Sequence, residues 1–557
     1  MRKLSDGYLT GPDGSPDGSN FCKCLIIGKV DGLTGKTPPG SLKDAKAPFQ
    51  SNLACPPKPS WRPNVQASQA RSSPVQPNPT KSNQPSLLLL GVWSFVLFAG
   101  CAVGPNYKRP AVSSPAIFRG DLSPTNSCFA DLEWWRVYED TNLQALVREA
   151  FTNNYDLRIA LTRVEQARAV VMQTRSQFVP SVNYNGNVGR GRNALFGSAF
   201  PDNGNTVSSA FATLNAFWEL DLWGRIRRLN EGARARFLAS EEARRGFRLI
   251  LLSDVAADYF RLLELDRELE IAGRTTNSFS ESLRIFSQRV AGGTASALEA
   301  SRAQAALADA TAAIPSILDE ISSTENALSL LLGRPPGPIE RSSATLQSLL
   351  PPEVPAGLPS SLLARRPDVR EAEQLLHSAN AQVGESVAEF FPKIGLTALL
   401  GRVSPELSAF SLGSANAWSI AAEASGPLFE GGRLVGQYRQ SKAARDEATL
   451  RYRQTALAAL RDVSDALSSR ERLAEMRVQR VLQVGALEAA VKLSSERYVA
   501  GKASYYEVLE AQQQLFPAEL NLARTERDQL LAIVTLYKAL GGGWEDENPS
   551  HLAAARK

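Results

Sequence analysis

The sequence predicts an α+β membrane protein that combines membrane-length strands with long coiled-coil helices and contains the whole arrangement twice. Three observations predict this class. Two stretches without proline, 223–290 and 432–499, are each 68 residues long. Alternating apolar runs of about 10 residues have the length of tilted strands that cross a membrane. Four short motifs also recur in the same order about 210 positions apart, which is far too long a period for a small-repeat solenoid.

Composition excludes several classes of function. The chain of 557 residues has 62 Lys and Arg against 57 Asp and Glu, and a net charge of +5 gives no indication of nucleic acid binding. Only two histidines are present, His377 and His551, and all five cysteines lie at or before Cys128. We therefore expect no metal site, no cofactor and no Cys/His or Ser/His/Asp catalytic centre in the main body, and hence no enzyme.

The N-terminal region reads as a leader followed by a signal peptide. Residues 1–80 are rich in Gly, Pro, Ser, Asn and Lys, so we expect a disordered leader or an extension translated from a wrongly chosen start. The apolar run 86–101 holds roughly 14 apolar residues, fewer than the about 20 of a membrane-spanning helix and typical of a signal-peptide core. We assign 81–100 as the signal peptide, with a short buried helix as the alternative.

The apolar run ends in the residues Ala99, Gly100 and Cys101. Small residues directly before a cysteine are typical of bacterial lipoprotein signals, in which the cysteine becomes the lipidated N-terminus. The residue three before the cysteine is usually Leu and is Phe98 here. We predict lipid attachment at Cys101 and a lipidated N-terminal segment over 101–135.

The repeat divides the rest of the chain. We expect a first repeat over 136–340, a linker over 341–365, a second repeat over 366–545 and a tail over 546–557. Four markers in the same order indicate a duplication. The matched markers are Pro180 with Pro392, Arg225 with Arg433, Gly292 with Gly501 and Gly333 with Gly541, at offsets of 212, 208, 209 and 208.

Each repeat is predicted to contain a helix, two strands and two further helices. The strands are predicted from apolar residues at every second position, which places them on one face. A half-buried sheet of a soluble protein has the same pattern and stays open as an alternative. The alternating residues are Ala210, Ala212, Leu214, Ala216, Trp218 and Leu220 in the first repeat, where Phe211 and Phe217 lie among the polar residues of the other face, and Ile394, Leu396, Ala398, Leu400, Trp418, Ile420, Ala422 and Ala424 in the second.

The long helices are predicted to pack as coiled coils, because apolar residues on them alternate spacings of three and four. We expect each long helix to end at a left-handed glycine, Gly292 or Gly501, that turns the chain back. Shorter helices over 296–332 and 504–540 are then predicted to return. The seam residues are Leu249, Leu252, Ala256, Tyr259 and Leu263 on the first helix, and Leu457, Leu460, Ser464 and Leu467 on the second.

Two motifs carry a family resemblance that covers about 86–544. They are CAVGPNYKRP, which starts at Cys101, and the stretch from Trp134-Trp135 to NNYDLRIAL. Together they resemble the TolC-like outer-membrane efflux proteins, in their lipoprotein (NodT-type) branch. Four strands cannot close a barrel, and an open edge in lipid leaves backbone groups unpaired. The resemblance implies a homotrimer with one shared 12-stranded barrel in the outer membrane, continued by a helical barrel through the periplasm.

The resemblance also implies a function and its partners. The protein would be a lipid-anchored, passive conduit that exports small molecules, working with a periplasmic adaptor protein and an inner-membrane pump. The turns at Gly292 and Gly501 would form the periplasmic tip. Glu507 and Glu510 match the acidic pair that lines the constriction, and as two stacked rings they would attract cations. An exposed polar stripe is the alternative reading of this pair.

Tyr498 matches a tyrosine that ties the closed tip in this family, but the basic partner is replaced by Ala503, next to Lys502. Two other functions stay open at this point. One is the channel of a type I protein secretion system, which has the same fold and a different partner. The other is a soluble coiled-coil scaffold, which would be an elongated dimer recovered without detergent.

Overall fold

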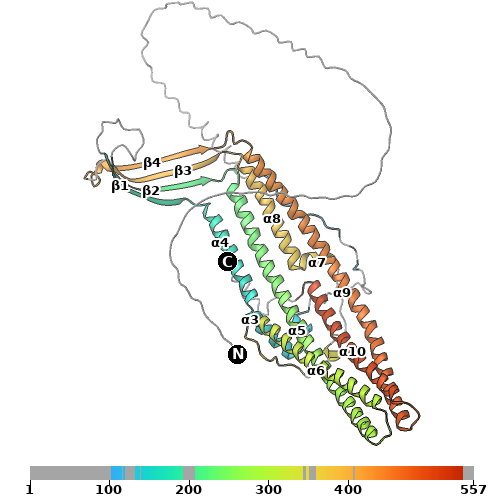
Figure 1. Cartoon of the computed structure of the whole chain (residues 1–557). Helices are drawn as coiled ribbons and strands as arrows, with labels where there is room; N and C mark the ends of the chain where they lie inside the picture. The colour runs from blue at the N-terminus through green and yellow to red at the C-terminus, as the bar shows by residue number, and fades with distance from the viewer. Residues whose placement is uncertain are drawn as a thin grey trace, which may run out of the picture. The chain divides into compact units, whose positions relative to one another are not determined.

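The computed structural model describes residues 102–113, 115, 117–118, 132–137, 140–191, 207–342, 346–349, 359–404 and 408–542. Helices predominate in this part of the chain, and four strands form a single sheet (Figure 1). The predicted leader, the signal peptide and Cys101 lie outside the described residues. Among the described helices, none is both long and apolar enough to cross a membrane.

Ten elements form two successive sets with the same order of helices and strands. Matching helices have equal lengths of 22, 67 and 35 residues. The first set is α4 (Tyr155–Ser176), β1 (Ser181–Gly191), β2 (Val207–Leu220), α5 (Arg225–Ala291) and α6 (Ala297–Leu331). The second set is α8 (Pro367–Ala388), β3 (Lys393–Ser404), β4 (Asn416–Ser425), α9 (Arg433–Val499) and α10 (Tyr505–Ala539).

Shorter elements precede or separate these sets: α2 (Trp134–Val137), α3 (Thr141–Asn153), the 3-10 turn η3 (Leu346–Leu349) and α7 (Pro359–Arg365). A second 3-10 turn, η4 (Gly413–Ala415), connects β3 to β4. The long helices begin within two residues of the predicted starts and end within one residue of the predicted ends. Each follows a glycine with positive φ, Gly224 at 83° and Gly432 at 92°. Because only glycine adopts this conformation readily, these residues mark the sharp change from strand to helix.

The sheet has the strand order β1-β2-β3-β4, and every neighbouring pair is antiparallel. One row of partners crosses all four strands: Tyr184, Leu214, Leu400 and Trp418. These side chains are exposed, at 84%, 51%, 63% and 75% of their surface. The next row on the same face is Val182, Ala216, Ala398 and Ile420.

The opposite face of the sheet is mostly polar, and its exposed or half-buried residues include Asn183, Asn215, Ser419, Glu219 and Glu423. The period-2 prediction is therefore confirmed for β2, β3 and β4. The soluble-sheet alternative would bury the apolar face, but in the described chain that face stays uncovered. One side of the sheet is apolar, and the other carries these polar residues together with Phe211, Phe217, Leu399 and Val403.

The main core lies along α5 and includes buried residues of α3, α6, α8, α9 and α10. All five predicted seam residues of α5 are buried, with Tyr259 fully enclosed. The Tyr259 hydroxyl donates a hydrogen bond to Asp140 (2.9 Å) and accepts one from the backbone N–H of Ser342 (3.1 Å). On α9, Leu460 and Leu467 are buried, whereas Leu457 is 59% exposed. The seam prediction is thus confirmed on α5 and only in part on α9.

Candidate functional site

Two helix reversals form the candidate site, one between α5 and α6 and one between α9 and α10. In the first, the N–H of Gly293 bonds to the carbonyl of Val290 and the N–H of Thr294 to that of Arg289. Gly501 and Lys502 bond in the same way to Tyr498 and Arg497. This is the Schellman pattern, which needs a left-handed residue directly after the helix cap.

The left-handed residues are Gly293, with φ of 70°, and Gly501, with φ of 65°. The prediction for Gly501 is confirmed in its backbone conformation, and the prediction for Gly292 is wrong. Gly292 has φ of −81° and is the helix cap, a conformation that any residue adopts. The cap of α9 is Ala500, so Gly293 rather than Gly292 is the counterpart of Gly501.

Figure 1 shows the two reversals side by side at the end of the helices, and an aromatic cluster joins them. Phe286 of α5 lies 3.9 Å from the ring of Tyr505 of α10 and 6.0 Å from that of Tyr498 of α9, between ring centres. Tyr498 and Tyr505 are 5.8 Å apart in a T-shaped arrangement. Phe286 and Tyr505 are almost fully buried. This separate small core fixes the second reversal against the first.

Tyr498 has a basic partner that the sequence did not indicate. The guanidinium of Arg289 lies 4.9 Å from the centre of the Tyr498 ring, and the same group donates a hydrogen bond to the Tyr498 hydroxyl. A guanidinium over an aromatic face is attractive even at an exposed site. Arg289 lies at the end of α5, so this contact connects the two reversals. The basic partner of Tyr498 is therefore Arg289 and not Lys502, the basic residue next to Ala503.

Glu507 and Glu510 lie on the exposed face of the first turns of α10, while Tyr505, Val508 and Leu509 are buried. Glu507 is 3.6 Å from Arg497, and Glu510 accepts a hydrogen bond of 3.4 Å from Gln514. The carboxylates therefore face away from the chain's own core.

The first reversal uses its matching acid differently. Glu299 accepts a hydrogen bond from the backbone N–H of Ser296 (3.0 Å) and completes a capping box at the start of α6. Ser504 makes no such bond at the start of α10, and Glu507 contacts Arg497 instead. Two residues in equivalent positions thus have different tasks: Glu299 caps a helix, and Glu507 presents its charge.

The position of α10, and hence of Glu507 and Glu510, is set by an antiparallel seam with α5. The contacts run in order, with residue numbers that rise along α5 and fall along α10. They are Glu264 with Arg527 (3.3 Å), Glu268 with Arg524 (2.7 Å), Arg274 with Glu519 (2.9 Å) and Ser278 with Gln512 (3.0 Å).

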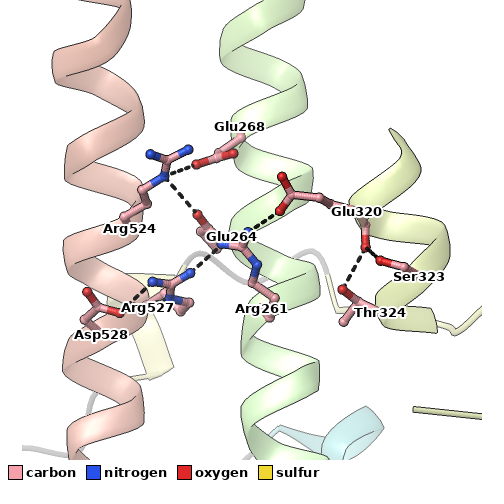
Figure 2. A network of polar contacts seen from close by, with 9 residues as sticks. All are labelled: Arg261, Glu264, Glu268, Glu320, Ser323, Thr324, Arg524, Arg527 and Asp528. Carbon is pink, nitrogen blue, oxygen red and sulfur yellow. Dashed lines mark hydrogen bonds and ion pairs between the residues drawn. The ribbon is translucent and has the colours of Figure 1, made fainter. Parts of the chain in front are cut away.

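Figure 2 shows the charged part of this seam, where Arg524 and Arg527 of α10 reach toward Glu264 and Glu268 of α5. Both glutamates are almost fully buried. Arg261 contacts both Glu264 and Glu320 of α6, so three helices meet here. Burial, with the neighbouring Glu268, raises the pKa of Glu264 to about 7 despite the arginines. This network, called the joint below, connects α5, α6 and α10 through ion pairs whose charges are costly to bury.

Comparison with known proteins shows what this architecture is. A family model described as "Outer membrane efflux protein" matches residues 146–334 and 358–542, which are the two sets of elements.

The chain belongs to the outer membrane efflux protein family.

Relatives of known name agree with this assignment to the outer membrane efflux family. The chain is 33% identical over 463 residues to the solvent efflux pump outer membrane protein SrpC of Pseudomonas putida, covering 82% of this chain and 98% of that one. It is 31% identical over 450 residues to the cation efflux system protein CusC of Escherichia coli, covering 80% and 96%.

A solved structure matches as well. The MtrE outer membrane channel of Neisseria gonorrhoeae, crystallised in an open state, aligns with a TM-score of 0.72 and 30% identity, over 80% of this chain and 99% of that one. This member of the outer membrane efflux family is therefore an efflux channel protein of the outer membrane, and its family is one of transport proteins.

Proposed function

We propose that the chain is the outer-membrane channel of a tripartite efflux pump and works as a homotrimer with one 12-stranded barrel. The observation that carries this proposal is the sheet. β1 and β4 each have a free edge in the described chain, and the uncovered face is apolar. In lipid, each unpaired backbone group costs several kcal/mol, so pairing of β4 with β1 of the next copy removes both edges.

The two faces of the sheet support the same proposal. A barrel built from it would direct Tyr184, Leu400, Trp418 and Ile420 toward lipid and the polar face toward the lumen. This distribution is typical of outer-membrane barrels that conduct. The equal helix lengths of the two sets and the two-part family match support an internal duplication, so three copies would supply six similar units to the helical wall.

The partners are proposed from the relatives. SrpC is named as part of a solvent efflux pump and CusC as part of a cation efflux system. We infer that this chain is likewise a passive conduit for small molecules, fed by an inner-membrane pump through a periplasmic adaptor. The paired reversals at Gly293 and Gly501 would form the periplasmic tip and meet the adaptor.

At this tip, Glu507 and Glu510 would form two stacked rings, six carboxylates in all, that attract cations. The exposed position of both side chains supports the lining role. Tyr498 would hold the tip closed through Arg289. Closure by this contact uses a basic residue from the end of α5 rather than one at Ala503 or Lys502.

Lipid attachment at Cys101 completes the proposal. The residues after it lie along α5 and α8: Val103 donates a backbone hydrogen bond to Trp223 (3.0 Å), and Asn380 donates one to Pro105 (2.9 Å). Ala102 contacts Gly224, where β2 gives way to α5. This path brings the start of the segment to the sheet end of the helices, where a barrel would leave the membrane.

Reconstitution of the purified protein in planar bilayers tests the function. The proposal predicts discrete channel openings with a preference for cations, and a reduced preference in the Glu507→Gln/Glu510→Gln variant. Glu281→Gln is the control, because Glu281 is exposed on α5 and pairs only with Arg284 among the described residues. Absence of any conductance would contradict the proposal of a conduit. An unchanged ion preference in the double variant would contradict the acidic rings.

A further inference from the structure

The seam between α5 and α10 has a counterpart that one chain cannot form. Arg225 and Arg433, which start α5 and α9, are 208 positions apart, and Ala297 and Tyr505, which start α6 and α10, are also 208 apart. The seam that matches α5 with α10 is therefore α9 with α6. Among the described helices, α6 and α9 do not pack along each other within the chain. In a closed ring of copies, this second seam lies between α9 of one copy and α6 of the next.

The shift of 208 positions identifies which residues would meet in the second seam. Glu264 of α5 corresponds to Arg472 of α9, and Arg527 of α10 corresponds to Asp319 of α6. The Glu264–Arg527 pair at 3.3 Å thus has a counterpart with the charges exchanged. The next pair along, Glu268 with Arg524, corresponds to Met476 with Ser316, which carry no charge.

Both residues of the reversed pair are accessible in the single chain. The Arg472 side chain is 66% exposed and contacts only Glu471 and Glu475 of its own helix in the described structure. Asp319 is exposed, and the described residues provide no ion pair for it. Apolar residues beside them, Leu318 and Met476, are 46% and 40% exposed. The two helix faces therefore offer opposite charges with apolar neighbours.

We propose that Arg472 of one copy pairs with Asp319 of the next copy, and that the exchanged charge order makes the two seams of the ring distinguishable. This inference rests on the trimer proposed above. In one wrong arrangement, α10 would pack along α9 of a neighbouring copy, and Arg527 would lie next to Arg472. In the other, α6 would take the place of α10 along α5, and Asp319 would lie next to Glu264.

Like charges brought together in this way disfavour the wrong arrangement more than the correct pair favours the right one. Without such a device, the similar helices of neighbouring copies could pair in the wrong seam while the trimer assembles. The charge order thus favours the α9–α6 pairing between copies, while the apolar contacts supply most of the attraction.

Disulfide cross-linking tests the pairing. The protein carries Asp319→Cys and Arg472→Cys, with Ser at every native cysteine except Cys101, and is oxidised in nanodiscs. The inference predicts a covalent trimer on non-reducing gels. The matched control is Glu320→Cys with Arg472→Cys, because Glu320 is next to Asp319 but contacts Arg261 of its own chain; this pair should link at least tenfold less.

The mass of the particle before oxidation separates the two proposals. A trimer that fails to cross-link through Asp319 and Arg472, or that links equally through Glu320, overturns the pairing and leaves the channel proposal standing. A monomer overturns both.

Charge exchange provides a second test that does not depend on cysteine chemistry. Arg472→Asp and Asp319→Arg should each lower the temperature at which the trimer dissociates, and the combined variant should recover at least half of the summed shift. A combined variant whose shift equals the sum of the two single shifts would show that the residues do not meet.

Discussion

Single residues decide how the two helix reversals close. Gly293 and Gly501 adopt the left-handed conformation that the Schellman bonds require, and a β-carbon would meet no atom within 4 Å at either position. Any cost of substitution there comes from backbone conformation rather than from crowding. Arg289 then joins the reversals by its contact with Tyr498.

Gly293→Ala and Gly501→Ala should each destabilise the protein by about 1 kcal/mol, because a side chain in the left-handed region is strained. Thermal unfolding of the solubilised protein measures the effect. Gly292→Ala is the matched control, since φ of −81° suits alanine and its loss of unfolded-state entropy is slightly stabilising. An equal loss for Gly292→Ala would contradict the assignment of the left-handed residue.

Arg289→Ala should weaken the closed tip and raise the mean conductance in planar bilayers several-fold, because Tyr498 loses its hydrogen bond and its cation–π contact. Arg284→Ala is the control, as Arg284 lies five residues earlier on α5 and is paired with Glu281. If both variants conduct like the unchanged protein, Arg289 does not contribute to closure.

At the scale of elements, α10 is the helix whose placement matters most, because it carries Glu507 and Glu510. Its seam with α5 combines the aromatic cluster at Tyr505 with the buried joint around Glu264 (Figure 2). The joint in Figure 2 contains the carboxylates of Glu264, Glu268, Glu320 and Asp528 against the guanidinium groups of Arg261, Arg524 and Arg527. Burial disfavours the charged form of Glu264, and the adjacent carboxylate of Glu268 disfavours it further.

Burial of Glu264, reinforced by the neighbouring Glu268, gives the joint a pH dependence of defined sign. The pKa of Glu264 is raised to about 7 from an ordinary value of 4.5, so between these values the native state holds a proton that the unfolded chain has lost. Stability should therefore fall as pH rises from about 4.5 to about 7.

Glu264→Gln should be about as stable as the unchanged protein at pH 5 and more stable at pH 8, by on the order of 2 kcal/mol. Unfolding at both pH values measures the difference, with the exposed Glu270→Gln as the control. A Glu264→Gln variant that is less stable at pH 8 would mean that the ion pairs outweigh the burial cost.

The strands provide another element-scale prediction. Ile420 and Ser419 are neighbours on opposite faces of β4, and Ile420 is 78% exposed. Ile420→Lys should destabilise the membrane-inserted form by about 2–4 kcal/mol, because a lysine near the bilayer centre is costly. Ser419→Lys, on the polar face, should have little effect. Equal sensitivity at both positions would argue against a lipid-facing apolar side.

At the scale of the whole molecule, the features predicted from the sequence are those determined by glycine and proline positions and by the spacing of apolar residues. Glycines and the lack of proline located α5 and α9 to within two residues, and alternation located the strand faces. Neighbouring glycines share one motif, so Gly292 was chosen over Gly293. Arg289 with Tyr498 and Glu264 with Arg527 were missed, because each contact joins residues more than 200 positions apart and depends on helix register.

The alternative of a soluble coiled-coil scaffold can also be compared with the channel at this scale. A soluble scaffold would leave no reason for the uncovered apolar face that runs from Tyr184 to Trp418. A channel, in contrast, needs that face and needs its two sheet edges closed by other copies. The central claim is therefore that the membrane part is complete only in an assembly.

The mass of the particle extracted in mild detergent, measured by light scattering with the detergent subtracted, tests this claim most directly. The account predicts a monodisperse particle of three chain masses that stays in solution only while detergent or lipid is present. A folded single-chain particle, or one that remains soluble after detergent removal, would contradict it.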